Sequence, residues 1–558
     1  MNPAPIDHLH ADLTAARYRV DVLDGIWGSS AAAALFRGQT LPARRELERR
    51  LAVPADGERP VPRPVETLAR LFVLGDSVTV ADLRGALPAT GVQGALELGI
   101  VGIVDGDAEL GGGAFGDDSR VRALLDLRPY SFVDSLGAGS WWIVSDLGEG
   151  ALGRALDEDH VLGVGGASMT LSGLMIASPV DSVLDLGTGC GIQALHAARF
   201  ARRVVATDIS RRALALAEFN ARLNRVESIE FRHGSLFEPV AGEQFDRIVS
   251  NPPFVITPRV DGVPLYEYRD GGLVGDGLVE SVVRQLGAHL RPGGIAQLLG
   301  NWEYRDAVPA SASAGTAAAP GSDAAASGPA SGAVGRQDGL ERVRSWVPRS
   351  GEHALDVWVI ERERQDAPTY AETWIRDGGT RPGTPAFDAL YAAWLDDFRD
   401  RGVTEVGFGY LLFRRPAAGA PTLARYERLD EGLGSNPVGL GDHVAACLDG
   451  HDWSVRHDDE ALLRATLVYA SDITEERHFW PGQEDPVVMT LRQGGGFGRS
   501  VSLDTGLAAF IGTCDGDLSV RAICGALAEV LAVDEAALTA ELLPSIRSLL
   551  ADAILLPA

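Results

Sequence analysis

A glycine-rich turn near the middle of the chain constrains the fold more than any other feature. Residues 183–191 read Val-Leu-Asp-Leu-Gly-Thr-Gly-Cys-Gly, and an alanine-rich stretch follows. The apolar run that ends in Asp185 is typical of a buried strand. The glycines let the backbone turn sharply and approach a ligand closely. The segment therefore predicts a strand over 182–186, a ligand-binding turn and a helix over 192–200.

A second apolar run ends in another acidic residue. Residues 204–207 precede Asp208, which follows Asp185 by roughly the 20 residues that separate a glycine-rich turn from a ribose-binding acid. A glycine-rich turn alone is a weak signal, because many such turns bind nothing. Here a strand precedes the turn, a helix follows it, and an acid stands at this spacing. The pattern therefore favours a nucleoside-containing ligand whose ribose hydroxyls donate hydrogen bonds to Asp208.

Strands and helices continue to alternate after this point. We expect strands at 228–231 and 245–250 and a helix at 211–224, with later strands at 294–299, 355–360 and 406–413. Alternation of this kind predicts an α/β fold with a doubly wound, mostly parallel sheet, whose ligands bind at the carboxyl ends of the strands. Asn251 lies at such an end and begins the sequence Asn251-Pro252-Pro253-Phe254.

The glycine-rich turn and the Asn-Pro-Pro-Phe sequence together resemble the class I S-adenosylmethionine-dependent N-methyltransferases. The similar group contains the release factor glutamine methyltransferases and the adenine and guanine N-methyltransferases. The resemblance covers about residues 158–300 and extends more loosely to about 415. It implies S-adenosyl-L-methionine as cofactor and a Rossmann-like domain with a seven-stranded sheet.

The Asn-Pro-Pro-Phe loop predicts how a planar nitrogen is activated. An amide or exocyclic amine is a poor nucleophile because its lone pair is delocalised. If the Asn251 side-chain oxygen and the Pro252 carbonyl accept its two hydrogens, the lone pair is directed at the methyl group, while Phe254 stacks on the planar target. Catalysis then consists of positioning and hydrogen bonding. The predicted catalytic residues are Asn251, Pro252, Pro253 and Phe254.

The resemblance also implies a set of cofactor-binding residues. Segment 161–171 resembles the part of the family that closes over the methionine moiety, and Ser235 stands where an adenine-binding Asp is usual. Segment 266–278 resembles the stretch that follows the Asn-Pro-Pro loop in the glutamine methyltransferases. The predicted cofactor set is Thr170, Asp185, Gly187, Thr188, Gly189, Gly191, Asp208, Ile209, Ser235, Leu236 and Asn251.

Charge and cysteine content restrict the partners. The net charge is −27 and none of the basic residues is lysine, which opposes strong nonspecific binding to nucleic acid. The four cysteines form no Cys-x-x-Cys pair, so we expect a reducing compartment and no metal site. The N-terminus lacks a signal-peptide pattern and no apolar run reaches the ~18–20 residues of a membrane span, which favours a cytoplasmic protein.

Pattern and composition divide the chain into three predicted regions. Residues 1–150 suggest a helical, winged-helix-like accessory domain, with its first helix at 11–23. Residues 151–415 form the methyltransferase domain, with a disordered insertion at about 308–335 and a helical stretch, 370–401, that shapes the substrate cleft. Residues 416–558 form a C-terminal accessory domain with a winged-helix-like end.

Three functions remain open from the sequence. The favoured one is methylation of a protein or peptide nitrogen, such as a Gln or Asn side-chain amide, because 266–278 resembles the glutamine methyltransferases. The second is methylation of an exocyclic amine of adenine or guanine in RNA or DNA. The third is a non-catalytic scaffold that retains the cofactor site, against which the intact Asn-Pro-Pro-Phe sequence argues. The sequence does not indicate an oligomeric state.

Overall fold

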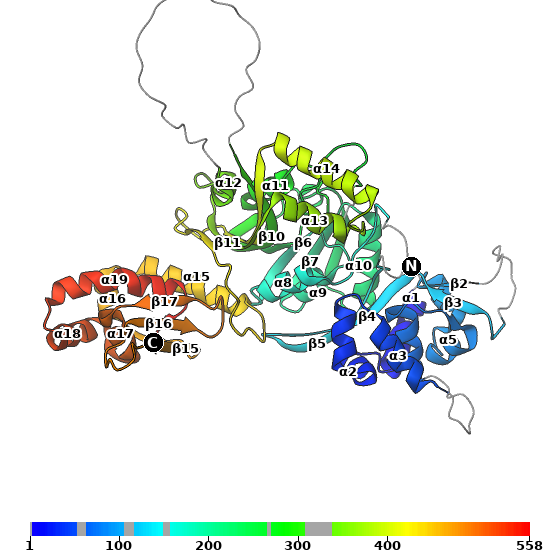
Figure 1. The fold of residues 1–558 in the computed structure, drawn as a ribbon, viewed down its shortest axis with the longest axis horizontal. Coiled ribbons are helices and arrows are strands. Elements are labelled where there is room, and N and C mark those ends of the chain that lie inside the picture. The colour runs from blue at the N-terminus through cyan, green and yellow to red at the C-terminus, as the bar shows by residue number, and fades with distance from the viewer. Residues whose placement is uncertain (1–2, 53–62, 105–115, 149–156, 265–268, 307–336) are drawn as a thin grey trace, which may run out of the picture.

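The protein has three lobes arranged in a row. A computed structural model describes residues 3–52, 63–104, 116–148, 157–264, 269–306 and 337–558. The N-terminal lobe and the C-terminal lobe flank a central lobe built on a large sheet (Figure 1). The predicted insertion at 308–335 and part of segment 266–278 lie outside the described residues.

The central lobe is a Rossmann-like domain with a mixed, eight-stranded sheet. Its strand order is β13-β11-β12-β10-β9-β6-β7-β8, and β12 alone runs antiparallel to its neighbours. The order reverses between β6 and β9, where a doubly wound sheet binds ligands. The strands are β6 (Val180–Leu186), β7 (Ala201–Asp208), β8 (Ile229–His233), β9 (Phe245–Ser250), β10 (Leu290–Arg305), β11 (Asp356–Asp366), β12 (Val403–Arg414) and β13 (Ala424–Arg428).

The resemblance implied a seven-stranded sheet, which is one strand fewer than the structure contains. The eighth, β13, begins after residue 415 and pairs in parallel with β11. It is held there because the Asp356 carboxylate accepts the backbone N–H groups of Thr422 and Leu423 at 2.7 and 2.8 Å. The sheet therefore extends past the end predicted for the methyltransferase domain, and the division into three regions stays a prediction.

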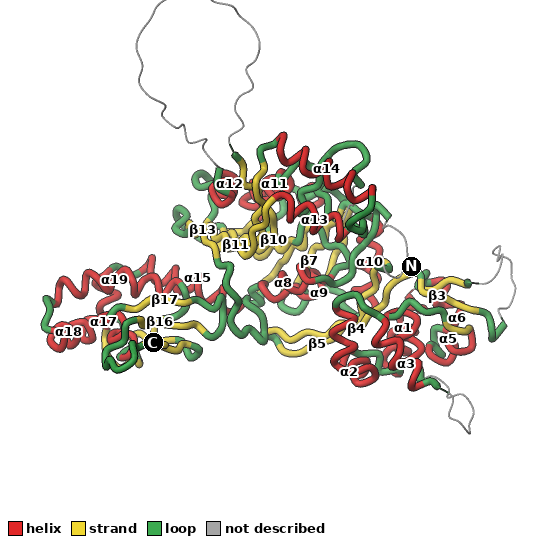
Figure 2. The backbone as a smooth tube through the Cα atoms, viewed as in Figure 1, coloured by secondary structure: helices red, strands yellow, loops and turns green. Residues whose placement is uncertain are grey.

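Helices cover both faces of this sheet (Figure 2). They are α8 (Gly166–Leu174), α9 (Ile192–Ala197), α10 (Arg211–Leu223), the 3₁₀ helix η2 (Glu238–Val240), α11 (Gly277–His289), α12 (Gly339–Trp346), α13 (Ala367–Asp377) and α14 (Pro385–Asp400). Two expectations were too simple. The helix predicted over 192–200 ends at Ala197, because the chain turns into β7 at Ala201. The stretch predicted over 370–401 is two helices, separated by a Gly- and Pro-containing turn at 378–384.

The N-terminal lobe packs a three-stranded sheet and a long hairpin against helices. The helices are α1 (Pro3–Ala15), α2 (Val20–Phe36), α3 (Leu41–Arg50), α4 (Pro64–Leu68), the π-helix η1 (Ala69–Val73), α5 (Val80–Ala86) and α6 (Gly91–Glu97). The strands are β1 (Val78–Thr79), β2 (Val101–Ile103), β3 (Arg120–Ala123), β4 (Leu125–Asp134) and β5 (Gly137–Asp146). The helix expected over 11–23 is broken into α1 and α2, because Arg17 adopts a left-handed conformation with φ of 52°.

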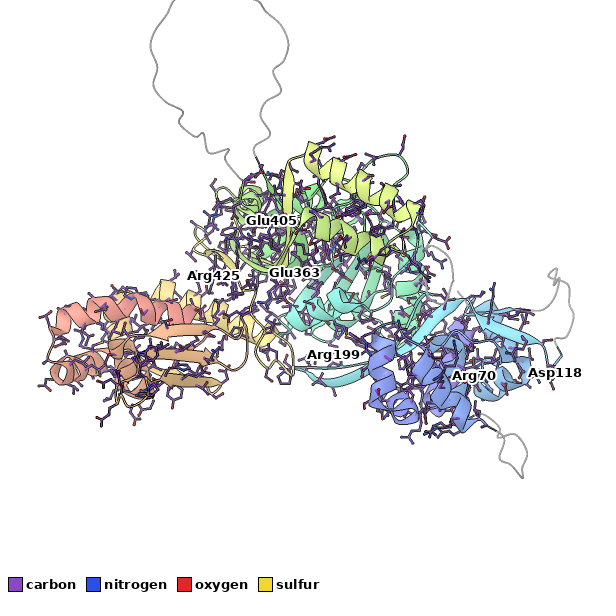
Figure 3. The ribbon with its side chains drawn as sticks, in the orientation of Figure 1. Arg70, Asp118, Arg199, Glu363, Glu405 and Arg425 are labelled. Atoms are coloured by element: carbon purple, nitrogen blue, oxygen red, sulfur yellow. The ribbon has the colours of Figure 1, made fainter. Side chains whose placement is uncertain are left out.

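Side-chain amides fasten the β4–β5 hairpin to the central lobe. The buried Asn220 of α10 accepts the Val144 N–H at 2.7 Å and donates to the carbonyls of Val144 and Cys190 at 2.8 and 2.9 Å. Arg199 adds an ion pair to Asp134 at 2.9 Å, at the junction of the two lobes (Figure 3). Asn220 thus links the hairpin of the N-terminal lobe to the glycine-rich turn at Cys190.

The C-terminal lobe contains two three-stranded sheets, ordered β18-β14-β19 and β15-β16-β17. Its elements are α15 (Gly441–Arg456), α16 (Asp459–Arg464), β14 (Thr466–Tyr469), β15 (Ile473–His478), β16 (Val488–Gln493), β17 (Ser500–Leu503), α17 (Thr505–Gly512), β18 (Asp515–Ser519), α18 (Val520–Leu531), α19 (Glu535–Ala551) and β19 (Leu555–Pro557). Arg425 of β13 pairs with Asp552 and so joins this lobe to the edge of the central sheet (Figure 3).

Candidate functional site

The predicted site residues gather at one edge of the central sheet. Because β6, β7 and β9 are parallel, the loops that follow them leave the sheet on the same side. The glycine-rich turn follows β6, Asp208 ends β7, and the Asn-Pro-Pro-Phe loop follows β9. All three border one cavity of about 790 Å³, a size suited to a cofactor together with part of a substrate.

The glycines of the turn have two different functions. Gly187, Gly189 and Gly191 all have positive φ, at 77°, 55° and 88°. A Cβ at Gly187 or Gly189 would meet no atom within 4 Å, whereas one at Gly191 would lie 3.0 Å from the Ala217 Cβ of α10. The first two leave space beside the cavity, and the third lets the turn pack closely against a helix.

Asp185 supports the turn from beneath. Its side chain is fully buried and accepts the Thr188 hydroxyl at 2.6 Å. Burial raises the pKa of this carboxyl to about 7. Its second oxygen, Oδ1, has no hydrogen-bond partner among the residues that the structure describes. Asp185 does not line the cavity itself.

Asp208 links the end of β7 to the glycine-rich turn. Its Oδ2 accepts the Gly189 N–H at 2.9 Å, and its Oδ1 accepts the Ser210 N–H at 2.8 Å. These bonds fix the carboxylate at the cavity wall. Each carboxylate oxygen can accept a further hydrogen bond, so both remain able to receive ribose hydroxyls.

The Asn-Pro-Pro-Phe loop presents an unpaired acceptor to the cavity. Asn251 Oδ1 is buried and has no hydrogen-bond partner in the described part of the chain. Burying such an oxygen costs about 1–3 kcal/mol unless a ligand donates to it. The loop is held by a hydrogen bond from the Val255 N–H to the Arg269 carbonyl at 3.0 Å. Asn251 is therefore placed to accept hydrogens from a bound target.

Aromatic rings surround the far side of this loop. The Phe254 ring lies 5.5 Å from the Phe408 ring of β12 and 6.4 Å from the Trp374 ring of α13. Trp374 and Asp377 of α13 also line the cavity. Arg269 donates to the Trp374 carbonyl at 3.0 Å and pairs with Asp377 at 3.6 Å. The part of the cavity beside Phe254 is thus walled by α13, a helix far away in the sequence.

Most residues of the predicted set border the cavity, and three do not. Those that line it are Gly187, Thr188, Gly189, Asp208, Ile209, Ser235, Leu236, Asn251, Pro252, Pro253 and Phe254. Asp185 and Gly191 lie behind the turn. Thr170 lies further along α8 than the residues of that helix that line the cavity, which are Gly166, Ala167 and Ser168. The roles of all these residues remain predictions.

Sequence reasoning missed several lining residues. Gln193 and Thr207 flank the glycine-rich turn, and each has a buried oxygen without a hydrogen-bond partner among the described residues. Their closeness in sequence to the glycine-rich turn and to Asp208 could have pointed to them as lining residues. Trp374 and Asp377 gave no local signal, because only the folded chain brings α13 to the loop.

The cavity suits S-adenosyl-L-methionine. The open space beside Gly187 and Gly189 accommodates close backbone approach, Asp208 offers carboxylate oxygens, and unpaired acceptors suit a ligand that is rich in donors. Among the described residues, no group of three or more His, Cys, Asp or Glu side chains is arranged to hold a metal ion. None of the helices in the described ranges is long and apolar enough to cross a membrane.

Comparison with known proteins agrees with this geometry. Residues 165–263 match the family model of the methyltransferase small domain. The match includes the glycine-rich turn, Asp208 and the Asn-Pro-Pro-Phe loop. The N-terminal residues 15–110 match a domain of unknown function (DUF7059).

The curated proteins that are similar to this chain include release factor glutamine methyltransferases. The chain is 40% identical to that of Xylella fastidiosa over 134 residues, which are 23% of this chain and 49% of the relative. It is 46% identical to that of Aliivibrio fischeri over 78 residues, which are 13% of this chain and 28% of the relative. The chain spans about half the length of these relatives or less. The resemblance to class I S-adenosylmethionine-dependent N-methyltransferases of the glutamine type is confirmed.

Solved structures of methyltransferases are also similar. A 16S rRNA N2 G1207 methyltransferase of Thermus thermophilus is 19% identical, with 43% of this chain and 62% of that chain covered and a TM-score of 0.24. A ribosomal protein L11 methylase of Lactobacillus delbrueckii is 29% identical, with 24% and 58% covered and a TM-score of 0.19. The description of the fold rests on the strand order given above.

Proposed function

We propose that this protein is an S-adenosyl-L-methionine-dependent N-methyltransferase that acts on the side-chain amide of a glutamine in a protein substrate. The observation that carries the proposal is the buried, unpaired Asn251 Oδ1 in the same cavity as the glycine-rich turn and Asp208. Support for glutamine comes from the relatives, which are release factor glutamine methyltransferases.

Residues at one end of the cavity bind the cofactor, and residues at the other end bind the target amide. Gly187, Gly189 and Asp208 hold the cofactor, which supplies an activated methyl group. Asn251 Oδ1 and the Pro252 carbonyl accept the two hydrogens of the target amide, which directs the nitrogen lone pair away from its own carbonyl. The Phe254 ring packs on the planar amide. No strong base is required, because the nitrogen becomes acidic as it is alkylated.

Methyl transfer to protein tests the proposal. The protein is incubated with S-adenosylmethionine carrying a labelled methyl group and a bacterial protein fraction that contains release factors. We expect label in protein, on a glutamine side chain, and labelling about 10²–10³-fold slower with Asn251→Ala. Label that nuclease releases and protease leaves in place would instead identify a nucleic acid base as the target.

We also propose that the flanking lobes are winged-helix-like accessory domains, working with the catalytic domain in the cytoplasm. In the N-terminal lobe the chain order is helix, β1, α5, α6, β2, β3, and the sheet order is β1-β3-β2, which suits a winged helix. In the C-terminal lobe β18, α18, α19 and β19 follow one another, and β14 completes the sheet. The strongly negative net charge favours recognition of protein over nucleic acid.

A further inference from the structure

Gln193 has an acceptor that nothing in the described part of the protein satisfies. Its side chain is 3% exposed and borders the cavity, and its Oε1 is buried without a hydrogen-bond partner among the described residues. Buried polar atoms are nearly always hydrogen-bonded in folded proteins. An unpaired oxygen on a cavity wall therefore points to a donor on the ligand.

The orientation of this amide is determined by its other end. Gln193 Nε2 donates to the backbone carbonyl of Ser168 at 2.7 Å. A carbonyl only accepts hydrogen bonds, so the group that faces Ser168 must be the NH₂ and the oxygen is left for the cavity. Gln193 thus connects the glycine-rich turn to the start of α8 while presenting an acceptor.

The position of Gln193 indicates which part of the cofactor its side chain contacts. Asp208 ends β7 and holds the ribose under the proposed function. Ser168 belongs to segment 161–171, which we expect to close over the methionine moiety because it resembles the segment that does so in the class I N-methyltransferases. The methionine moiety carries an ammonium group with three N–H donors, and a charged donor makes a stronger hydrogen bond than a neutral one.

We propose that Gln193 Oε1 accepts a hydrogen bond from the α-ammonium group of the cofactor, and that Gln193 is a binding residue for its amino acid end. This inference rests on the proposed function. A glutamine suits the position because one amide donates to Ser168 and accepts from the ligand at the same time. A glutamate would place an acceptor against the Ser168 carbonyl.

Calorimetric titration with three ligands tests this role without relying on turnover. The ligands are S-adenosylmethionine, S-adenosylhomocysteine and 5′-methylthioadenosine, of which the last lacks the amino acid end. For Gln193→Met, which keeps the length of the side chain, we expect binding about tenfold weaker for the first two ligands, as for loss of one charge-assisted hydrogen bond. Binding of 5′-methylthioadenosine should be unchanged. The matched control is Gln285→Met on the exposed face of α11, which should bind all three ligands as the wild type does.

The pattern across ligands decides between binding and structural roles. Equal weakening for all three ligands, or no weakening for any, overturns the inference. If wild-type protein binds none of them, the proposed function itself fails. Gln193→Asn is measured in parallel, so the answer does not depend on whether Gln193→Met folds. The Gln193→Asn variant keeps the amide on a side chain that is one methylene shorter. We expect it to show the same selective loss of affinity for the first two ligands.

Discussion

The loops after β6 and β9 lie at the same sheet edge but are built in opposite ways. In the loop after β6, polar groups are paired inside the protein, as in the Thr188–Asp185 and Gly189–Asp208 hydrogen bonds. In the loop after β9, Asn251 Oδ1 is buried and has no partner among the described residues. Internal hydrogen bonds fix the shape of the first loop before a ligand arrives, whereas the acceptor of the second loop is left for its target. Substitutions in the first should therefore change cofactor affinity, and substitutions in the second should change turnover.

Asn251→Ala should give the largest effect. It removes the oxygen that acts on the target nitrogen, and loss of one such preorganised polar group typically lowers kcat by about 10²–10³-fold. Cofactor affinity should stay within about twofold of wild type, because Gly187, Gly189 and Asp208, which hold the cofactor under the proposed function, are untouched. Single-turnover methyl transfer and calorimetry measure the two quantities. A variant that transfers methyl groups at the wild-type rate would show that the two loops do not differ in this way.

Asp208→Ala should produce the converse result. Losing the carboxylate that receives the ribose costs about 1.5–3 kcal/mol, which corresponds to a weakening of cofactor binding by about 10–100-fold. Asp181→Ala is the matched control, since Asp181 is an exposed carboxylate paired with Arg202 outside the cavity. Calorimetric titration with S-adenosylhomocysteine checks both variants. Equal affinity in Asp208→Ala and Asp181→Ala would remove Asp208 from the cofactor site.

Trp374→Ala sharpens the boundary between the two ends. Trp374 lies beside Phe254 and lines the part of the cavity where the target amide is proposed to bind. Its loss removes one aromatic contact and should raise the KM for the substrate by about tenfold. The dissociation constant of the cofactor should not change. Trp480→Ala, in the exposed part of the C-terminal lobe, serves as the control. If Trp374→Ala weakens cofactor binding instead, α13 belongs to the cofactor end.

The pH dependence of stability tests the burial of Asp185 at the end of β6. Burial raises the pKa of Asp185 from 3.8 to about 7, so the folded protein holds this proton more tightly than the unfolded chain does. The stability that this adds is complete below the unfolded pKa and is lost as the pH rises through about 7. Asp185→Asn stays neutral, so its melting temperature should gain on the wild type between about pH 5 and pH 8. A constant difference across this range would show that Asp185 is ionised throughout.

Some residues of the site could be predicted from the sequence alone, and others could not. Asp208 and Asn251 were predictable because each ends a buried strand, and parallel strands bring such ends together. Gln193 was overlooked because a single polar residue in an alanine-rich helix has no distinctive pattern. Trp374 was out of reach, since it meets Phe254 only through the packing of α13 on the sheet. The strand β13 was missed because 424–428 is short and charged, and its pairing depends on Asp356.

The central claim is that Asn251 activates a planar amide nitrogen in the cavity that holds the cofactor. The most direct measurement is mass spectrometry of a bacterial protein fraction after incubation with S-adenosylmethionine and either wild-type protein or Asn251→Ala. The account predicts one added methyl group on a glutamine side chain with the wild type, and about 10²–10³-fold slower methylation with the variant, although both bind the cofactor. Wild-type protein that binds the cofactor and methylates no protein glutamine would contradict it.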